Sequence, residues 1–254
     1  MNINDLVTRK SYNHDIVFQI KDIQGDTYIL KGVNYRLFAD SNKQDLVSYQ
    51  KPITLELPDI RKESSRLVSG KILHIDGDKV YMQKAEDAYR KYKVYAKCVY
   101  LDENLQPGSI ITLLKQDKYD VLVLTGHDFI KIDNKQNKQD LTSYQNSFNF
   151  VVAVQLARTI YPDLDSLVII AGACQSNYEA LIANGANFAS SPKRENIHLL
   201  DPIIIATIVA TTPIKEYVSP EEAISQTISK SLGGIETKGK ARRHFTGVNK
   251  NGYS

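Results

Sequence analysis

The sequence has few cysteines and no long apolar run. Cys98 and Cys174 are its two cysteines among 254 residues, too few for a disulfide framework, and no CxxC pair offers a zinc or redox site. No stretch reaches the roughly 18 consecutive apolar residues of a membrane-spanning helix. Residues 1–5 lack the basic and apolar segments of a secretory signal. We therefore expect a cytoplasmic protein with free thiols and no membrane partner.

Strong charge and clustered metal ligands are also missing. The net charge of +3 is small, and we predict no nucleic-acid partner. The five histidines are too scattered for the close ligand spacing of a zinc site. The sequence predicts neither a metal nor another cofactor.

The first part of the chain has the pattern of a small β-domain. Residues 1–55 contain short alternating runs at Asp5–Arg9, Ile16–Ile20 and Thr27–Lys31, with a Gly25-Asp26 turn signal before the third. Short strands with tight turns predict a β-barrel of SH3-like size. Residues 56–69, the end of a proline-containing and charged stretch that begins at Gln50, predict a linker.

From residue 70 to residue 254, apolar runs alternate with helical spacing. The predicted strands are Ile72–Ile75, Val94–Leu101, Val121–Leu124, Leu167–Ala171 and one ending near Ala189. The predicted helices are Lys79–Tyr92, Ser109–Gln116, Phe150–Ile160, Asn177–Ala183, Asp201–Ala210 and one starting at Ser219-Pro220. This rhythm predicts an α/β fold with a mostly parallel sheet covered on both faces. Ligands then bind beyond the carboxyl ends of the strands.

Two of these strands are followed by a glycine and then a reactive side chain. Val121–Leu124 precedes His127, and Leu167–Ala171 precedes Cys174. If the strands are neighbours, imidazole and thiol face each other across a cleft, and the histidine lowers the thiol pKa. The start of the next helix would further favour the thiolate and an oxyanion. Taken singly, a cysteine at a strand end is usually a small buried apolar residue, as we predict for Cys98.

At this point a family resemblance becomes specific. The chain resembles the YabG family of sporulation-specific cysteine proteases over nearly its whole length. The segments that carry it include Asp5–Tyr12, Leu73–Asp78, Thr125–Asp128, Gly172–Ser176, Gly185–Pro192, Asn196–His198, Asp201-Pro202 and Leu232–Thr237. The resemblance implies a cysteine endopeptidase of the mother-cell cytoplasm, associated with the spore coat, that processes spore coat and cortex-lytic precursor proteins.

The His and Ala-Cys segments are more distantly similar to caspase-like peptidases. That similarity implies a caspase-like α/β/α sandwich and a Cys174–His127 dyad that forms an acyl-enzyme. It also implies an oxyanion hole from the backbone N–H groups of Asp128 and Cys174. Those enzymes usually have glycine after the histidine, whereas Asp128 stands here, and its carboxylate needs an explanation.

The YabG resemblance also implies cleavage after arginine, and a guanidinium needs a carboxylate in its pocket. We predict Asp76 as that acid, with Asp78 and Asp128 as the next candidates. The alternative is that Asp76-Gly77-Asp78 is a turn and helix cap. His74, inside the same strand, is predicted to be a core residue.

Other polar residues keep two interpretations each. His198 and Asp201 either line the pocket or belong to a helix start, with Asp201 as its N-cap. Arg242 and Arg243 are either a solvated basic tail or a self-cleavage site. The alternative functions are a glutamine amidotransferase-like hydrolase that uses Cys174 with His198, and a non-enzymatic spore-coat scaffold.

Overall fold

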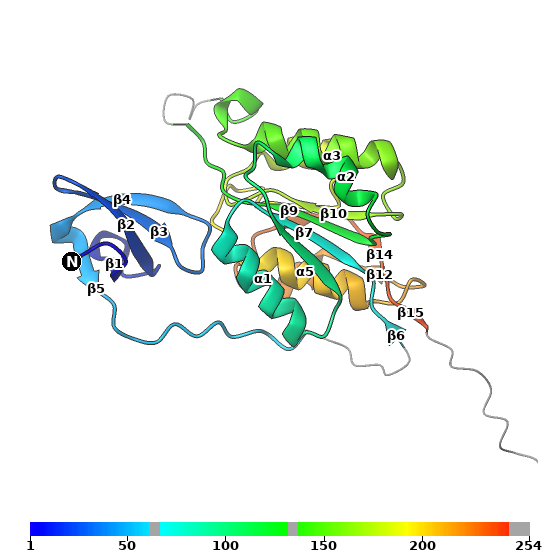
Figure 1. Ribbon diagram of the computed structural model, residues 1–254, viewed down its shortest axis with the longest axis horizontal. Coiled ribbons are helices and arrows are strands. Elements are labelled where there is room, and N and C mark those ends of the chain that lie inside the picture. The colour runs from blue at the N-terminus through cyan, green and yellow to red at the C-terminus, as the bar shows by residue number, and fades with distance from the viewer. Residues whose placement is uncertain (61–66, 132–136, 244–254) are drawn as a thin grey trace, which may run out of the picture.

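The computed structural model describes residues 1–60, 67–131 and 137–243. The N-terminal residues form an antiparallel sheet, which lies at one end of a larger α/β unit (Figure 1). The α/β class and the mostly parallel sheet predicted from the sequence are confirmed.

The antiparallel sheet has five strands in the order β4-β3-β2-β1-β5. They are β1 (Leu6–Arg9), β2 (Phe18–Gln24), β3 (Thr27–Gly32), β4 (Phe38–Asn42) and β5 (Leu46–Ser48). Alternate residues such as Phe18, Ile20 and Leu30 are fully buried and form its own small core. The sequence did not predict β4 and β5, because they are short and carry mostly polar or half-exposed residues.

The second sheet has six strands in the order β13-β11-β10-β9-β7-β8. They are β7 (Ile72–Asp76), β8 (Ala96–Tyr100), β9 (Val121–Thr125), β10 (Val168–Ala171), β11 (Phe188–Ala189) and β13 (Gly233–Gly234). All neighbours are parallel except β13, which runs antiparallel to β11. Cys98 lies on the edge strand β8 and is therefore only partly buried, unlike the core residue we predicted.

Helices cover both faces of this sheet (Figure 1). They are α1 (Lys79–Lys91), α2 (Gln106–Leu114), α3 (Ser147–Ile160), α4 (Tyr178–Ala183), α5 (Asp201–Thr211) and α6 (Pro220–Ser225). The core on one face combines α2, α3 and α4 with the residues Leu122 and Ile169; the opposite core combines α1 and α5 with Val123 and Ile170. Every strand residue from Val121 to Thr125 is buried, as expected for a strand covered on both sides.

The remaining short elements differ from the predictions. The strand β6 (Leu67–Val68) lies inside the predicted linker and pairs with β15 (Arg242–Arg243), and β12 (Tyr217–Val218) pairs with β14 (Thr237–Lys238). Helix α2 begins at Gln106, three residues earlier than predicted, with Pro107 in its first turn. Short 3₁₀ turns occur at Lys10–Tyr12, Lys43–Asp45 and Leu141–Ser143.

The connection between the two sheets is anchored along the α/β unit. From residue 49 to residue 60 it has no helix or strand. Leu55 and Leu57 pack against the core beside α1, and the Tyr92 hydroxyl donates to the Pro58 carbonyl at 3.0 Å. The N-terminal sheet is therefore held near the α/β unit by packing as well as by covalent continuity.

One buried side chain ties the sheet edge together. The Asn187 side-chain oxygen accepts from the Ile169 N–H and from Arg158, and its NH₂ donates to Leu164 and Thr237. Asn187 is fully buried. It thus satisfies four polar groups at once, a set that no apolar residue could replace.

We expect Asn187→Ala to lower the free energy of unfolding by about 2–4 kcal/mol, because buried donors and acceptors lose their partners. Urea denaturation followed by circular dichroism measures this. The matched control is Gln155→Ala, which removes an exposed amide bonded to Asn184 and should change stability by less than about 0.5 kcal/mol. Equal effects of the two substitutions would contradict the assigned role.

Candidate active site

The strands that precede His127 and Cys174 are direct neighbours. Val121 to Leu124 of β9 pair in parallel with Val168 to Ala171 of β10, and Asp76 at the end of β7 pairs with Thr125 of β9. The predicted adjacency of the two strands is therefore confirmed. Asp76, His127 and Cys174 therefore lie at the same carboxyl edge of the sheet. This edge faces the N-terminal sheet (Figure 1).

Cys174 lies on a tight turn after β10. Gly172 before it has φ +105°, and a Cβ there would come within 2.8 Å of Leu181, so the turn requires glycine. The sulfur contacts the backbone of Ile197, whose N–H points at it from 3.4 Å. The side chain is 1% exposed.

The Cys174 thiol is protonated in this arrangement. Burial raises its pKa to about 11, although the backbone of Ile197 and of Arg36 and the Arg36 charge act in the opposite direction. The sequence predicted a lowered thiol pKa, and the structure shows the reverse. Helix α4 begins at Tyr178 and has six residues, too far along and too short to outweigh the loss of solvent around the sulfur.

His127 is oriented by a carboxylate. Its Nε2 lies 2.8 Å from Oδ2 of Asp78, so Nε2 donates to this carboxylate and Nδ1 is left as the other ring nitrogen. That Nδ1 is buried and has no hydrogen-bond partner among the described residues. The described residues include no hydrogen bond between His127 and Cys174; instead Tyr81 and Phe38 flank the imidazole, with ring centroids at 5.7 and 4.8 Å.

Asp78 has three roles around the histidine. Its carboxylate caps α1 by accepting from Val80 and Tyr81, bonds His127, and forms an ion pair with Lys31 from β3. Burial alone would raise the pKa of Asp78, but the bonds from His127 and Lys31 outweigh it and hold that pKa far below its usual range. Asp78 is therefore the helix cap that the alternative interpretation predicted, and it also contacts the predicted base His127.

Asp76 is fully buried and binds an arginine of the same chain. Both oxygens accept from Arg36, at 2.8 and 2.6 Å, and His74 lies behind with its Nε2 3.5 Å from Oδ2. Burial would raise the pKa of Asp76, yet Arg36 and His74 lower it to about 2. His74 is fully buried and its Nδ1 lies 2.9 Å from the Tyr89 hydroxyl, the core position expected for it.

Asp128 connects the loops after β9 and β10. It accepts from Ser147 at 2.5 Å, from Ser176 at 2.8 Å and from the N–H groups of Phe129 and Asn146. Burial raises its pKa despite these bonds. This network accounts for a carboxylate next to His127. Among the described residues, the backbone N–H groups of Asp128 and Cys174 have no acceptor, so both are free for an oxyanion.

His198 and Asp201 form a separate polar cluster before α5. The Asp201 carboxylate accepts from the N–H of His198 at 2.8 Å and from Ser229 at 2.5 Å, and Asp201 is the first residue of the helix rather than its N-cap. Burial lowers the pKa of His198 to about 4, and its Nδ1 accepts from the Leu200 N–H. His198 packs edge-on against Tyr35, with 5.2 Å between ring centroids.

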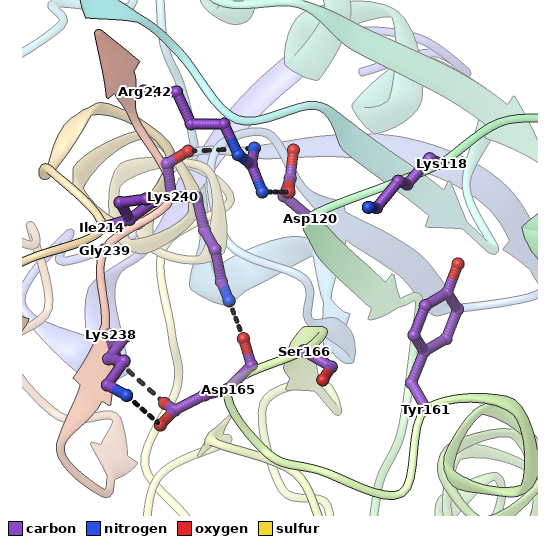
Figure 2. Close-up of a pocket in the computed structure, with 10 residues that line it drawn as sticks. All are labelled: Lys118, Asp120, Tyr161, Asp165, Ser166, Ile214, Lys238, Gly239, Lys240 and Arg242. Atoms are coloured by element: carbon purple, nitrogen blue, oxygen red, sulfur yellow. Dashed lines mark hydrogen bonds and ion pairs between the residues drawn. The ribbon is translucent and has the colours of Figure 1, made fainter.

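Arg242 and Arg243 lie near the amino ends of the strands, opposite to the carboxyl edge that holds His127 and Cys174. Arg242 bonds Asp120 at 2.9 Å, immediately before β9 begins, and lines a pocket of about 420 Å³ (Figure 2). Lys238 and Lys240 point into the same pocket, where Asp165 binds both (Figure 2). This pocket is far from the three residues at the carboxyl edge, because it lies at the amino ends of β9 and β10.

Three contributors were not predicted. Glu103 accepts the His127 N–H at 2.6 Å, and Arg36 and Tyr81 surround Asp76. Glu103 comes just after the predicted strand Val94–Leu101, so the sequence pattern could have placed it at the same carboxyl edge. Arg36 carried none, because its contacts depend on how the N-terminal sheet docks, and Tyr81 lies in the predicted helix α1, whose facing partners the sequence pattern does not give.

The comparisons with known proteins show the family of the chain. The sequence matches the family model described as YabG peptidase U57 over residues 2–66 and 54–246. The chain belongs to the YabG peptidase family. It is also 38% identical over 281 aligned positions to the sporulation-specific protease YabG of Bacillus subtilis (strain 168), covering 94% of this chain and 96% of that protein.

No solved structure matches the chain. The described residues contain no group of three or more histidine, cysteine or acidic side chains that could hold a metal ion. Within the same residues, no helix is both long and apolar enough to cross a membrane.

We expect Cys174 to react slowly with iodoacetamide in the native Cys98→Ser protein. A pKa of about 11 instead of 9.0 leaves about 100-fold less thiolate at pH 7. The rate, measured by intact-mass spectrometry, should rise about tenfold per pH unit until pH 10. The same protein unfolded in urea is the control and should label rapidly. Fast native labelling at pH 7 would contradict the buried, protonated thiol.

Proposed function

We propose that this member of the YabG peptidase family is a cysteine endopeptidase that cleaves proteins after arginine, with Cys174 as nucleophile and His127 as base. The observation that carries the proposal is the neighbouring pairing of β7, β9 and β10, since it brings Asp76, His127 and Cys174 to one edge of the sheet. A nucleophile, a base and a buried carboxylate at one edge are the parts that cleavage beside a basic residue needs.

The proposed reaction passes through an acyl-enzyme. Nδ1 of His127 takes the thiol proton, and the sulfur attacks the carbonyl carbon of the substrate arginine. The oxyanion accepts from the backbone N–H groups of Asp128 and Cys174. The C–N bond then breaks as His127 returns the proton to the leaving amine. Water, deprotonated by His127, attacks the thioester, releases the carboxylate product and restores the thiol.

Asp78 completes this assignment as a positioning residue. It holds Nε2–H of His127, which leaves Nδ1 as the basic atom, and its charge stabilises the imidazolium during proton transfer. A chain of nucleophile, base and orienting acid is common to nucleophilic hydrolases.

For the larger setting we propose a caspase-like α/β/α arrangement preceded by an SH3-like domain. The supporting features are the helices on both faces of a mostly parallel sheet and the separate five-stranded antiparallel sheet. The proposed substrates are spore coat and cortex-lytic precursor proteins in the mother-cell cytoplasm. The similarity to a relative named a sporulation-specific protease supports the role in sporulation.

We expect Cys174→Ala and His127→Ala each to lower kcat/KM by about 10⁴-fold or more on a peptide mixture with arginine sites. His198→Ala should stay within about tenfold, because its imidazole accepts from the Leu200 N–H and serves the loop before α5. Mass spectrometry of the products gives both rates and cut sites. Loss of activity with His198→Ala and retention with His127→Ala would favour the amidotransferase-like alternative. Full activity of Cys174→Ala would remove Cys174 as the nucleophile, and absence of cleavage by the wild-type protein would favour a non-enzymatic scaffold.

We expect Asp78→Asn to lower kcat/KM by about 10²-fold or more, since the carboxylate no longer stabilises the imidazolium. Asparagine is also a good N-cap, so α1 should still form, while loss of the ion pair with Lys31 should lower the melting temperature. The control Lys31→Met removes the other ion-pair partner of Asp78 and should not lower activity. A wild-type rate for Asp78→Asn would remove Asp78 from the mechanism.

A further inference from the structure

The loop between β3 and β4 inserts its tip into the candidate active site. We call residues 32–37 the plug loop. Its Arg36 is 1% exposed although it lies in a connection between two strands of a small peripheral sheet. Arginine is almost never fully buried unless it is paired, and here the pair is with Asp76, 40 positions further along the chain.

The guanidinium lies in a site shaped for it. Nη1 and Nη2 donate to the two oxygens of Asp76 at 2.8 and 2.6 Å, in an end-on fork. The Tyr81 ring stacks against Arg36, with 4.8 Å from Cζ to the ring centroid. Asp76 is the residue that the sequence predicted as the acid of an arginine pocket.

The backbone around Arg36 also occupies the site. Arg36 lies close enough to the Cys174 thiol that its charge and its backbone lower the pKa of that thiol against the effect of burial. The preceding residue, Tyr35, forms a β-bridge with His198, and the Leu199 N–H donates to the Asn34 carbonyl at 2.8 Å. After the loop, Phe38 packs on the His127 ring. One short segment thus contacts the predicted pocket acid and the predicted base, and it lies near the predicted nucleophile.

The loop is closed on itself rather than extended. Gly32 N–H donates to Leu37 at 2.7 Å, and Leu37 N–H donates to Tyr35 at 2.8 Å. A Cβ at Gly32 would collide with the Tyr35 carbonyl. The nitrogen that would leave in a cut after Arg36 is therefore already bonded in a tight turn, a geometry suited to occupying the site without being cleaved.

Side chains of α1 hold the plug loop through hydrogen bonds to its backbone carbonyls. The Tyr81 hydroxyl donates to the carbonyls of Gly32 and Tyr35, and Lys84 donates to the Val33 carbonyl at 2.8 Å. Nε of Arg36 is buried and has no partner among the described residues. The pocket therefore leaves one donor of this guanidinium unsatisfied.

We propose that the plug loop is an internal competitive inhibitor, whose Arg36 occupies the pocket that a substrate arginine must enter. This inference rests on the proposed function for its effect on hydrolysis. It does not rest on that function for the pocket itself, which would bind any ligand with a free guanidinium once the loop is displaced.

The activity test compares full-length Arg36→Ala with wild type on a peptide that contains one arginine. Removing the occupant should raise kcat/KM by about tenfold or more, because the competent fraction rises. The matched control is Arg9→Ala in the same sheet; Arg9 stacks on Tyr12 and Phe18 and its removal should leave the rate unchanged. Where the wild-type protein cuts the peptide, a folded Arg36→Ala protein with wild-type or lower kcat/KM would overturn the proposal.

A second variant keeps the test valid if Arg36→Ala fails to fold, since that substitution leaves Asp76 buried without its partner. Lys84→Met removes one anchor of the loop and leaves the Arg36–Asp76 pair intact. It should raise kcat/KM about fivefold, and an unchanged rate in this stable variant would count against the proposal.

A binding readout separates this inference from the proposed function. Agmatine, a small guanidinium compound, should bind Arg36→Ala and raise its melting temperature, and should not affect wild type. Iodoacetamide should also label Cys174 at least about tenfold faster in Arg36→Ala. If agmatine binds and labelling accelerates while no variant cuts peptide, the proposed function fails and the plug stands. If agmatine shifts neither protein and labelling is unchanged, the plug is refuted even when peptides are cut.

Discussion

The buried ion pair between Arg36 and Asp76 joins the two parts of this molecule. Either charge alone would be costly to bury, so each part stabilises the other only while the pair is made. The pair lies at the carboxyl edge of β7, the strand next to β9. The position of the N-terminal sheet is therefore coupled directly to access to Cys174.

A second contact between the two parts lies beside the first. Lys31 of β3 pairs with Asp78, which also orients His127 and caps α1. The N-terminal sheet thus contacts the pocket acid through one side chain and the acid behind the base through another. Displacement of the sheet would change the electrostatics at both, so docking and proton transfer share one carboxylate.

The α/β unit was predictable where the sequence pattern is periodic and local. The apolar runs that became β7, β9 and β10 and the spacing of α1 gave the sheet and the edge on which His127 and Cys174 lie. The short strands β4, β6, β12 and β13 were missed, since two to five residues carry too little pattern. β6 and β15 in particular pair over more than 170 positions (242 − 68 = 174).

The site was only partly predictable for a related reason. Asp78 and Glu103 lie on the expected edge, but their partners depend on side-chain directions that periodicity does not give. The raised pKa of Cys174 follows from burial beneath residues of a different part of the chain. The contacts of Arg36 depend on docking between two units, which no local pattern encodes.

The two ends of the central sheet also differ in what they can reach. The predicted nucleophile is at the carboxyl edge, while Arg242 pairs with Val68 at the amino edge. A folded molecule could not bring its own Arg242 to its own Cys174, so trimming there would require two molecules. Such trimming would follow second-order kinetics and accelerate as the protein accumulates, whereas release of Arg36 is a unimolecular step whose rate does not depend on concentration.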